Sequence, residues 1–290
     1  MYRCLCLLVL IVAGCDTTST PVPSPSPSAS VEAGLRRGNA PPREAAFDPQ
    51  QCGNVKGVVR WTGPPPVIPL LESVENPVEY VPGSPHLKRA WPHPHTPRLN
   101  ENRLAGALVW LEGALPTRSR NRDASVWLVA LENRQFSQSR GLARVGDELA
   151  VVSRDPFFHS LQARGASHFS LALPEPGIVR KRPLQQPGIV ELRSGAGMFW
   201  MRSYFLVQPH PFMAVTNQLG EFTFDEVPEG AYQLVAWHPS WEIIRRERSP
   251  DNLQVIQLQF SEGHRTQQPI RVTPRAASSA PVEVSLGGQP

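Results

Sequence analysis

Lysine is nearly absent from this chain of 290 residues, so arginine supplies almost all of its positive charge. Lys56, Lys88 and Lys181 are the only lysines, and the formal net charge is +4. An excess this small and this scattered does not predict the broad basic surface that nucleic-acid binding requires. We therefore expect an ordinary solvated surface and no nucleic-acid partner.

No apolar run is long enough to span a bilayer as a helix. The run at residues 5–12 follows Arg3 in a short basic start, and small residues come after it, which is typical of an export signal. The ending VAGC at residues 12–15 resembles the lipobox of bacterial lipoproteins, in which the cysteine becomes the lipidated first residue of the mature chain. That resemblance implies a lipid anchor on Cys15 and a place in the cell envelope, periplasmic or surface-exposed; the alternative is a plain signal peptide.

Cysteine is scarce too, and its placement excludes a disulfide framework. Cys4 and Cys6 lie in the expected signal, and Cys15 would carry lipid, so Cys52 is the only thiol left in the mature chain. No intrachain disulfide is then possible. We expect Cys52 to act as a small buried hydrophobe, with an intermolecular bond as the alternative.

Motifs of the common enzyme classes are missing as well. The sequence has no phosphate loop, dinucleotide fingerprint or zinc-protease helix. Ser194 lacks the glycine two positions earlier that a nucleophile elbow requires, and the acidic residues show no spacing that would pair them. We expect a protein that is not an enzyme.

Proline is abundant, with 32 residues, which disfavours long helices and favours turn-rich β structure. Short apolar or alternating segments bounded by Gly, Pro, Asn or Asp predict strands, and such segments suit an antiparallel sandwich better than a parallel sheet with crossover helices. The segments are residues 55–61, 104–111, 125–131, 148–153, 167–173, 188–193, 213–216, 221–224, 232–237 and 256–260.

A Pro-rich stretch at residues 64–100 carries His86, His93 and His95. Alternating His and Pro can indicate a metal-binding tract. An extended strand points successive side chains in different directions, however, and no Cys or paired carboxylate joins these histidines. We therefore expect no metal site in this stretch.

Residues 214–238, AVTNQLGEFTFDEVPEGAYQLVAWH, resemble the core of the transthyretin-like, or carboxypeptidase-regulatory-like, β-sandwich. The matching features are Gly220-x-Phe222, a Val-Pro pair at residues 227–228, and Gly230-x-Tyr232 leading into a strand. Gly220 and Gly230 would supply positive φ in turns. Residues 57–59 and 107–109 fit the early strands of the same family, which implies one sandwich interrupted by an insertion.

The inserted stretch resembles a cupredoxin. The resemblance rests on residues 146–149 (GDEL), 154–159 (RDPFFH), the loop 194–201 (SGAGMFWM) and residues 205–211. A blue-copper site uses two imidazoles, a thiolate and a weak axial thioether. In related sequences the loop reads Cys, three residues, His, two residues, Met, which places the thiolate at Ser194, the second imidazole at Met198 and the axial thioether at Met201. His159 stands in the place of the first imidazole.

Because Ser194 replaces the thiolate, the resemblance implies a copper-free cupredoxin-like domain without electron transfer. His159, Met198 and Met201 still offer one nitrogen and two thioether donors, a set that suits Cu(I), so a copper-handling protein remains the alternative. The other interpretation of the methionines is core packing. His168, His210 and His238 are candidate extra ligands, and the tryptophans Trp91, Trp200, Trp237 and Trp241 are candidates for a glycan or partner surface.

The sequence thus predicts an all-β, lipid-anchored, non-enzymatic binding or scaffolding protein of the cell envelope. Its fold is expected to be a cupredoxin-like Greek-key sandwich coupled to a transthyretin-like sandwich, with an unidentified protein or glycan partner. The predicted division is a signal peptide (1–14), a disordered Pro/Ser-rich tether (15–51), the early transthyretin-like strands with the Pro-rich loop (52–120), the cupredoxin-like domain (121–207), the remainder of the transthyretin-like sandwich (208–274) and a disordered tail (275–290).

Overall fold

The computed structural model describes residues 48–74, 88–115, 123–251, 254–274 and 281–287. The expected all-β class is confirmed, because in these ranges the regular elements are strands apart from one short 3-10 helix, η1 (Pro49–Gln51). None of the helices in these ranges has the length and hydropathy to cross a bilayer. The predicted signal peptide, Cys15 and most of the predicted tether lie outside the described residues.

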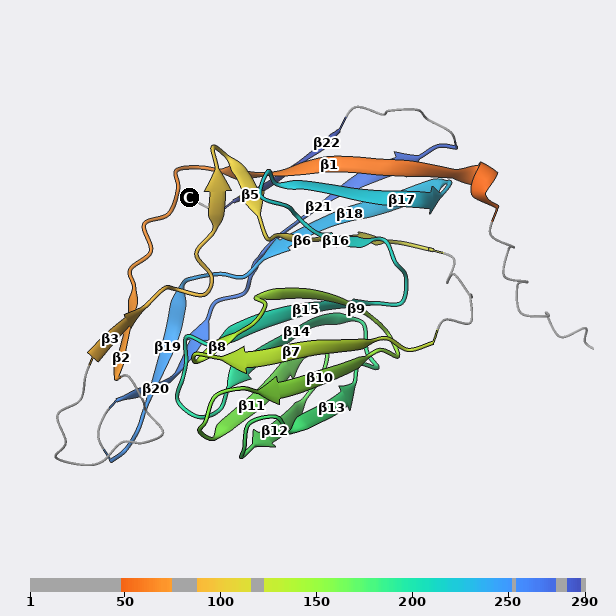
Figure 1. Ribbon diagram of the computed structural model, residues 1–290. Coiled ribbons are helices and arrows are strands. Elements are labelled where there is room, and N and C mark those ends of the chain that lie inside the picture. The colour runs from red at the N-terminus through yellow and green to blue at the C-terminus, as the bar shows by residue number, and fades with distance from the viewer. Residues whose placement is uncertain (1–47, 75–87, 116–122, 252–253, 275–280, 288–290) are drawn as a thin grey trace, which may run out of the picture. The chain divides into compact units, whose positions relative to one another are not determined.

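Two sheets built from the two ends of the described chain form what we call the flanking sandwich (Figure 1). One sheet holds β1 (Cys52–Thr62), β4 (Arg98–Asn100), β5 (Arg103–Ala105), β17 (Glu221–Pro228) and β22 (Val282–Gly287). The other holds β6 (Leu108–Glu112), β16 (Met213–Val215), β18 (Gly230–His238) and β21 (His264–Val272). Alternation along β17 and β18 buries Phe222, Phe224, Tyr232 and Leu234 in one core between the sheets.

Gly57 and Gly220 show why glycine is needed in this sandwich. A Cβ on Gly57 would lie 2.4 Å from the Phe222 ring, so the strand pairing of β1 with β17 depends on the missing side chain. Gly220 has φ +70° in the turn before β17, as expected, and its backbone packs closely on Val59 and Leu104.

Residues between β6 and β16 form the inserted sandwich, drawn mainly in green in Figure 1. One sheet has the order β13 (Val179–Pro183), β10 (Glu148–Ser153), β7 (Val126–Glu132), β8 (Gln135–Phe136). The second has the order β12 (Phe169–Leu173), β11 (His159–Gly165), β14 (Gly188–Ser194), β15 (Arg202–Gln208), β9 (Arg140–Arg144). A large apolar core fills the space between the two sheets.

Two hairpins complete the fold: β2 (Leu71–Val74) with β3 (Lys88–Trp91), and β19 (Ile243–Arg248) with β20 (Val255–Phe260). The two sandwiches also touch. Tyr204 and Leu206 on the outer face of β15 share an apolar cluster with Trp110 of β6 and with Val235 and Trp237 of β18. This shared cluster fixes the inserted sandwich against the flanking one.

Three expectations from the sequence need correction. The tail was expected to be disordered, but residues 282–287 alternate in polarity and form β22, which pairs in parallel with β1 and buries Val284 and Leu286. The sheets are mixed rather than purely antiparallel, because β7 pairs in parallel with β10 and β9 with β15. Gly230 does not have positive φ; its missing side chain makes room for the Tyr232 hydroxyl, which would lie 2.8 Å from a Cβ.

Candidate functional site

The loop that resembles a copper-ligand loop joins β14 to β15 and is held by its own hydrogen bonds. The Ser194 hydroxyl accepts a hydrogen bond from the Ala196 amide at 3.1 Å, and the Gly195 amide donates to the Ser160 carbonyl at 2.7 Å. Gly197 has φ +79°, and the Met201 amide closes the turn on the Met198 carbonyl at 2.9 Å. Ser194 therefore serves as a cap inside the loop, which is a structural role.

His159 starts β11 next to this loop, because Leu161 pairs with Ser194 in the sheet. Its ring is fully buried, and Nε2 lies 2.9 Å from the Asp155 carboxylate. Since a carboxylate only accepts, Nε2 carries the hydrogen and Nδ1 presents its lone pair. Burial lowers the pKa of His159, while Asp155 opposes that shift. Nδ1 is buried and has no hydrogen-bond partner among the residues that the structure describes.

Met198 and Met201 are buried in the core of the inserted sandwich with Phe199 and Trp200. In the described ranges, no three residues among His, Cys, Asp and Glu lie together as a metal site would need. The serine and the methionines thus do not fit a blue-copper site. An imidazole lone pair and two thioethers are donor types that suit a soft metal, and metal binding by His159, Met198 and Met201 stays a prediction.

Most of the other candidate residues are buried. His210 and His238 are buried and bond to backbone groups, and His168 is exposed. Trp91 stacks on Trp200 with a centroid separation of 4.3 Å. Cys52 is buried, and its Sγ lies 3.4 Å from the Asp48 carbonyl oxygen.

Two of the three histidines in the Pro-rich stretch belong to the described residues, and both have aromatic and polar partners. His86 falls outside the described residues, whereas His93 and His95 are buried and pack edge-on against Phe260 of the β19–β20 hairpin. His95 Nδ1 lies 2.5 Å from the Ser240 carbonyl oxygen, so Nδ1 carries the hydrogen. This stretch therefore anchors the hairpin region to the inserted sandwich.

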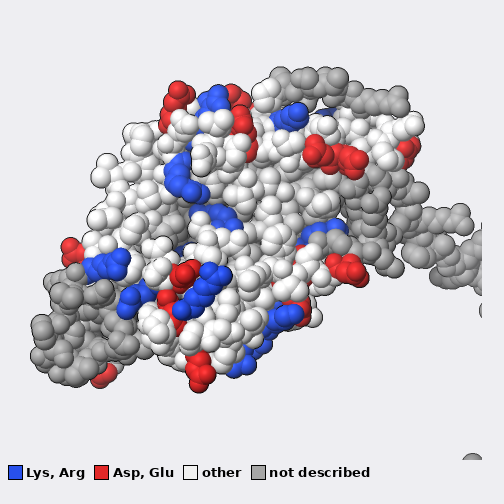
Figure 2. Space-filling model, viewed as in Figure 1, with Lys and Arg blue, Asp and Glu red and all other residues white. Residues whose placement is uncertain are grey.

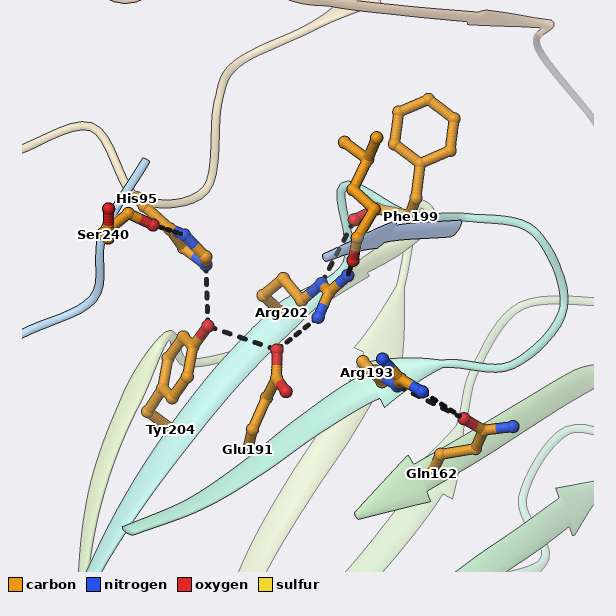
Figure 3. Close-up of polar contacts among 9 residues, drawn as sticks. His95, Gln162, Glu191, Arg193, Phe199, Arg202, Tyr204 and Ser240 are labelled. Atoms are coloured by element: carbon orange, nitrogen blue, oxygen red, sulfur yellow. Dashed lines mark hydrogen bonds and ion pairs between the residues drawn. The ribbon is translucent and has the colours of Figure 1, made fainter. Parts of the chain in front are cut away.

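A chain of buried polar contacts continues from His95 across the outer face of the inserted sandwich (Figure 3). The Tyr204 hydroxyl lies 2.8 Å from His95 Nε2 and 3.2 Å from Glu191 Oε1, and its single hydrogen can serve only one of them at a time. Burial, followed by the charge of Glu191, raises the pKa of Tyr204, while burial lowers the pKa of His95 well below its ordinary value. Both groups therefore stay neutral at pH 7.

Arg202 links this chain to the hairpin. It forms an ion pair with Glu191, and it donates to the Leu258 carbonyl of β20 at 2.5 Å and to the Phe199 carbonyl at 3.3 Å. These contacts join β14, the β14–β15 loop and the hairpin in one polar cluster, visible in Figure 3. The Arg202 side chain is only 2% exposed, so its charge is largely shielded from water.

A cavity of about 440 Å³ opens beside this cluster, between the inserted sandwich and the β19–β20 hairpin. We call it the interface cleft. One wall comes from β11, β14 and β15, the other comes from β19 and β20, and Trp237 lies at the junction. The volume is within the usual range for small-molecule sites. The charged side chains lining it are Arg164, Glu191, Arg193, Arg202, Arg245 and Glu247.

Sequence reasoning missed this cleft, although one signal for it was present. Residues 188–193 were correctly predicted as a strand, and Glu191 and Arg193 alternate there with buried Val190 and Leu192. Such charges normally face water, but here a second element covers them. Nothing in residues 243–248, IIRRER, predicted that a hairpin would lie over this face.

Across the face of the molecule drawn in Figure 2, acidic and basic side chains are interspersed, and neither sign dominates a large area. The concentration of arginine at the interface cleft is therefore a local feature. Burial first, and then the nearby charges of Arg164 and Arg202, lower the pKa of Arg193 to about 10. Even so, the guanidinium remains protonated at neutral pH.

No family model matches the chain, and no curated protein matches it. Among solved structures, it is similar in part to the copper-containing nitrite reductase of Thermus scotoductus, with 15% identity over 33% of this chain and 27% of that chain and a TM-score of 0.27. An oxidized mutant of amicyanin has 14% identity over 31% of this chain and 87% of that chain, with a TM-score of 0.25.

A purple cupredoxin from Nitrosopumilus maritimus also has 14% identity, over 29% of this chain and 99% of that chain, with a TM-score of 0.25. The chain spans about a quarter of the length of the nitrite reductase. At these identities and scores nothing about copper is carried over from these proteins to this chain. What the fold itself shows is an all-β protein built of packed sheets.

Proposed function

We propose that this protein is a lipid-anchored, non-enzymatic binding protein of the bacterial cell envelope, and that its ligand binds in the interface cleft. The observation that carries the proposal is the cleft itself. Two walls from different parts of the chain enclose it, and a buried polar cluster holds the walls together. A site whose walls are fixed before the ligand arrives loses little entropy when the ligand binds.

The arrangement of titratable groups favours binding over catalysis. Glu191 is paired with Arg202, and the Tyr204 hydroxyl is enclosed between Glu191 and His95. The shifts in pKa keep Tyr204 and His95 neutral at pH 7, while a general acid or base works best with a pKa near the operating pH. These groups are therefore suited to holding the cleft in shape.

A paired set of variants tests binding in the cleft. Gln259 of β20 is exposed and lines the cavity, so Gln259→Trp should fill it without disturbing the core. Gln233→Trp, at an exposed position of β18 away from the cavity, is the matched control. In a thermal-shift screen of small envelope metabolites against the full-length protein, we expect at least one ligand that stabilises wild type and Gln233→Trp but not Gln259→Trp. If every hit stabilises Gln259→Trp equally, the cleft is not the site.

The anchoring part of the proposal rests on the lipobox-like residues 12–15, VAGC, in which Cys15 would carry the lipid. The Pro/Ser-rich stretch after Cys15 would act as a tether. Cys15→Ala should move the protein from the membrane fraction to the soluble fraction. The control is Cys52→Ala, which should leave the distribution unchanged. Membrane association that persists in Cys15→Ala would refute lipidation.

Copper handling is the second candidate function, and one observation favours it. His159 Nδ1 is buried, presents a lone pair and has no partner in the described part of the chain, and Asp155 holds the ring by its other nitrogen. With the Met198 and Met201 thioethers, it would supply donors suited to Cu(I). Bound Cu(I) would add a soft cation to the core of the inserted sandwich, and this chain's own residues would only hold it.

Competition with a Cu(I) chelator separates the two functions. If the protein is copper-free, full-length wild type and His159→Ala should bind Cu(I) equally weakly. Sub-nanomolar binding that is lost in His159→Ala and Met198→Ala, but kept in Met213→Ala on β16, would establish copper handling instead. A blue colour with Cu(II) would contradict both, because it requires a thiolate that only Cys52 can supply.

A further inference from the structure

The charges lining the interface cleft do not balance. Four arginines and two glutamates line it, so its walls carry a surplus of two positive charges. Glu191 is already committed to Arg202 inside the polar cluster. Arg164, Arg193 and Arg245 are therefore offset only by Glu247, and the cleft lacks negative charge.

Arg193 has donors left over. Its Nε and Nη2 groups donate to the Gln162 side-chain oxygen at 3.2 and 3.0 Å. The Gln257 side-chain amide finds partners for both its oxygen and its nitrogen in one orientation. In that orientation the oxygen accepts from Arg193 Nε and Nη2, and the nitrogen donates to the Glu247 carboxylate at 3.2 Å. The Nη1 group has no hydrogen-bond partner among the described residues, so its two N–H groups remain for a ligand in the cleft.

Arg164 and Arg245 bring cations from the two opposite walls. Arg164 belongs to β11 and Arg245 to β19, and both line the cavity with exposed side chains. Within the described residues neither side chain makes a hydrogen bond or an ion pair. An anion in the cleft would have guanidinium groups on both walls. Arg164 and Arg245 can each form two parallel hydrogen bonds with a carboxylate, while Arg193 offers its Nη1 group.

The remaining lining mixes apolar side chains, two of its aromatic rings among them, with uncharged polar groups. Trp237 and Phe260 supply apolar ring surface, and Gln257, Gln259 and Ser261 supply donors and acceptors. A pyranose ring has the same mixture, with C–H groups on its faces and hydroxyls at its edge. Aromatic rings beside uncharged polar groups suit such a ligand.

From this juxtaposition we propose that the interface cleft binds an acidic saccharide, a sugar bearing carboxylate groups that are held by Arg164, Arg193 and Arg245. The inference rests on the proposed binding function and names the ligand class of the same site. Two carboxylates would cancel the surplus of two positive charges on the walls. A neutral sugar would leave that surplus uncompensated.

Titration calorimetry on the full-length protein tests the proposal, with digalacturonate as the probe. The neutral counterpart is α-1,4-galactobiose, which has the same rings without carboxylates, and succinate tests for a dicarboxylate without a sugar. We expect digalacturonate to bind at least tenfold more tightly than either. Arg193→Gln and Arg245→Gln should each weaken its binding by at least tenfold. Arg180→Gln, on the exposed edge strand β13, should leave binding unchanged.

The outcomes separate this inference from the proposed function. If galactobiose binds as tightly as digalacturonate, and Gln259→Trp removes both, the cleft binds a ligand but the acidic class is wrong. If succinate binds as tightly as digalacturonate, the saccharide class is wrong. If digalacturonate does not bind, or if Arg180→Gln weakens binding as much as Arg193→Gln, the inference is overturned. If digalacturonate binds equally well to Gln259→Trp, the proposed site fails too.

Discussion

Replacing Arg202 with methionine should weaken the attachment of the β19–β20 hairpin to the inserted sandwich. Methionine keeps much of the buried stem but removes the charge. The change would leave Glu191 without its cation and the carbonyl groups of Phe199 and Leu258 without a donor. Unlike a surface pair, this ion pair is shielded from water, since the side chains of Arg202 and Glu191 are 2% and 22% exposed.

Breaking a buried ion pair by removing one partner costs about 3–5 kcal/mol, most of which comes from the uncompensated charge that remains. Because Glu191 keeps some contact with water and with Tyr204, we expect the lower end, about 3 kcal/mol, for Arg202→Met. Adding Glu191→Leu removes the stranded carboxylate. The double variant should therefore lose about 1–3 kcal/mol less than the two single variants together.

Urea titration followed by circular dichroism measures the total loss, and hydrogen exchange measures where it occurs. In Arg202→Met, protection should fall first in the amides of β20, before the core of the flanking sandwich opens. A loss below about 1 kcal/mol with unchanged protection of β20 would refute the idea that Arg202 holds the hairpin. Additive losses in the double variant would refute the coupling with Glu191.

Three further predictions concern stability. Burial lowers the pKa of His93 to about 4 and of His238 to about 3, so the unfolded chain, with a histidine pKa near 6.5, takes up protons first on acidification. The melting temperature should be highest above about pH 6.5 and should fall between about pH 6.5 and 4. The fall should be shallower in His238→Gln. A melting temperature that does not change with pH would exclude a link between histidine protonation and stability. Gly57→Ala should cost about 1–3 kcal/mol because its Cβ meets an aromatic ring and a carbonyl oxygen, whereas Lys56→Ala next to it should be nearly neutral in the same urea titration. Asp155→Ala should cost about 3 kcal/mol, because the carboxylate accepts two turn amides at 2.6 and 3.0 Å; a cost as small as that of Lys56→Ala would argue against this role.

The sequence predicted strands well wherever apolar and polar residues alternate against a core. Residues 148–153 form β10 with the expected bounds. Alternation also identified β14 and most of β18. It failed where strands bury little. Every residue of β13 is exposed and β19 is mostly charged, so neither carries an apolar period.

The short tail strand β22 was missed for a different reason. Its alternating residues 282–287 follow a stretch rich in Ala and Ser, and a strand of six residues at a chain end reveals its partner only in three dimensions. The parallel pairing with β1 is a contact between the two ends of the described chain. Local sequence carries no signal for such a contact.

The loop at residues 194–201 and the interface cleft also differ in whether local sequence could predict them. The prediction that Ser194 stands in the place of a thiolate could be made from the sequence, because the ligand spacing of the resembling loop is local. The interface cleft draws Arg164, Arg193 and Arg245 from three strands, and only the fold brings them together. Until the hairpin is placed over the sheet, the outer residues of β11 and β14 are indistinguishable from an ordinary solvated face.

The measurement that most directly tests ligand binding in the interface cleft is hydrogen exchange of the full-length protein with and without saturating digalacturonate. Binding between the two walls should slow amide exchange at least tenfold in one peptide from each wall. These peptides are residues 188–194, which form β14, and residues 255–261, which include β20. Exchange in β13 should be unaffected. Protection confined to the loop 194–201 around Met198, or protection absent from both walls, would contradict the account.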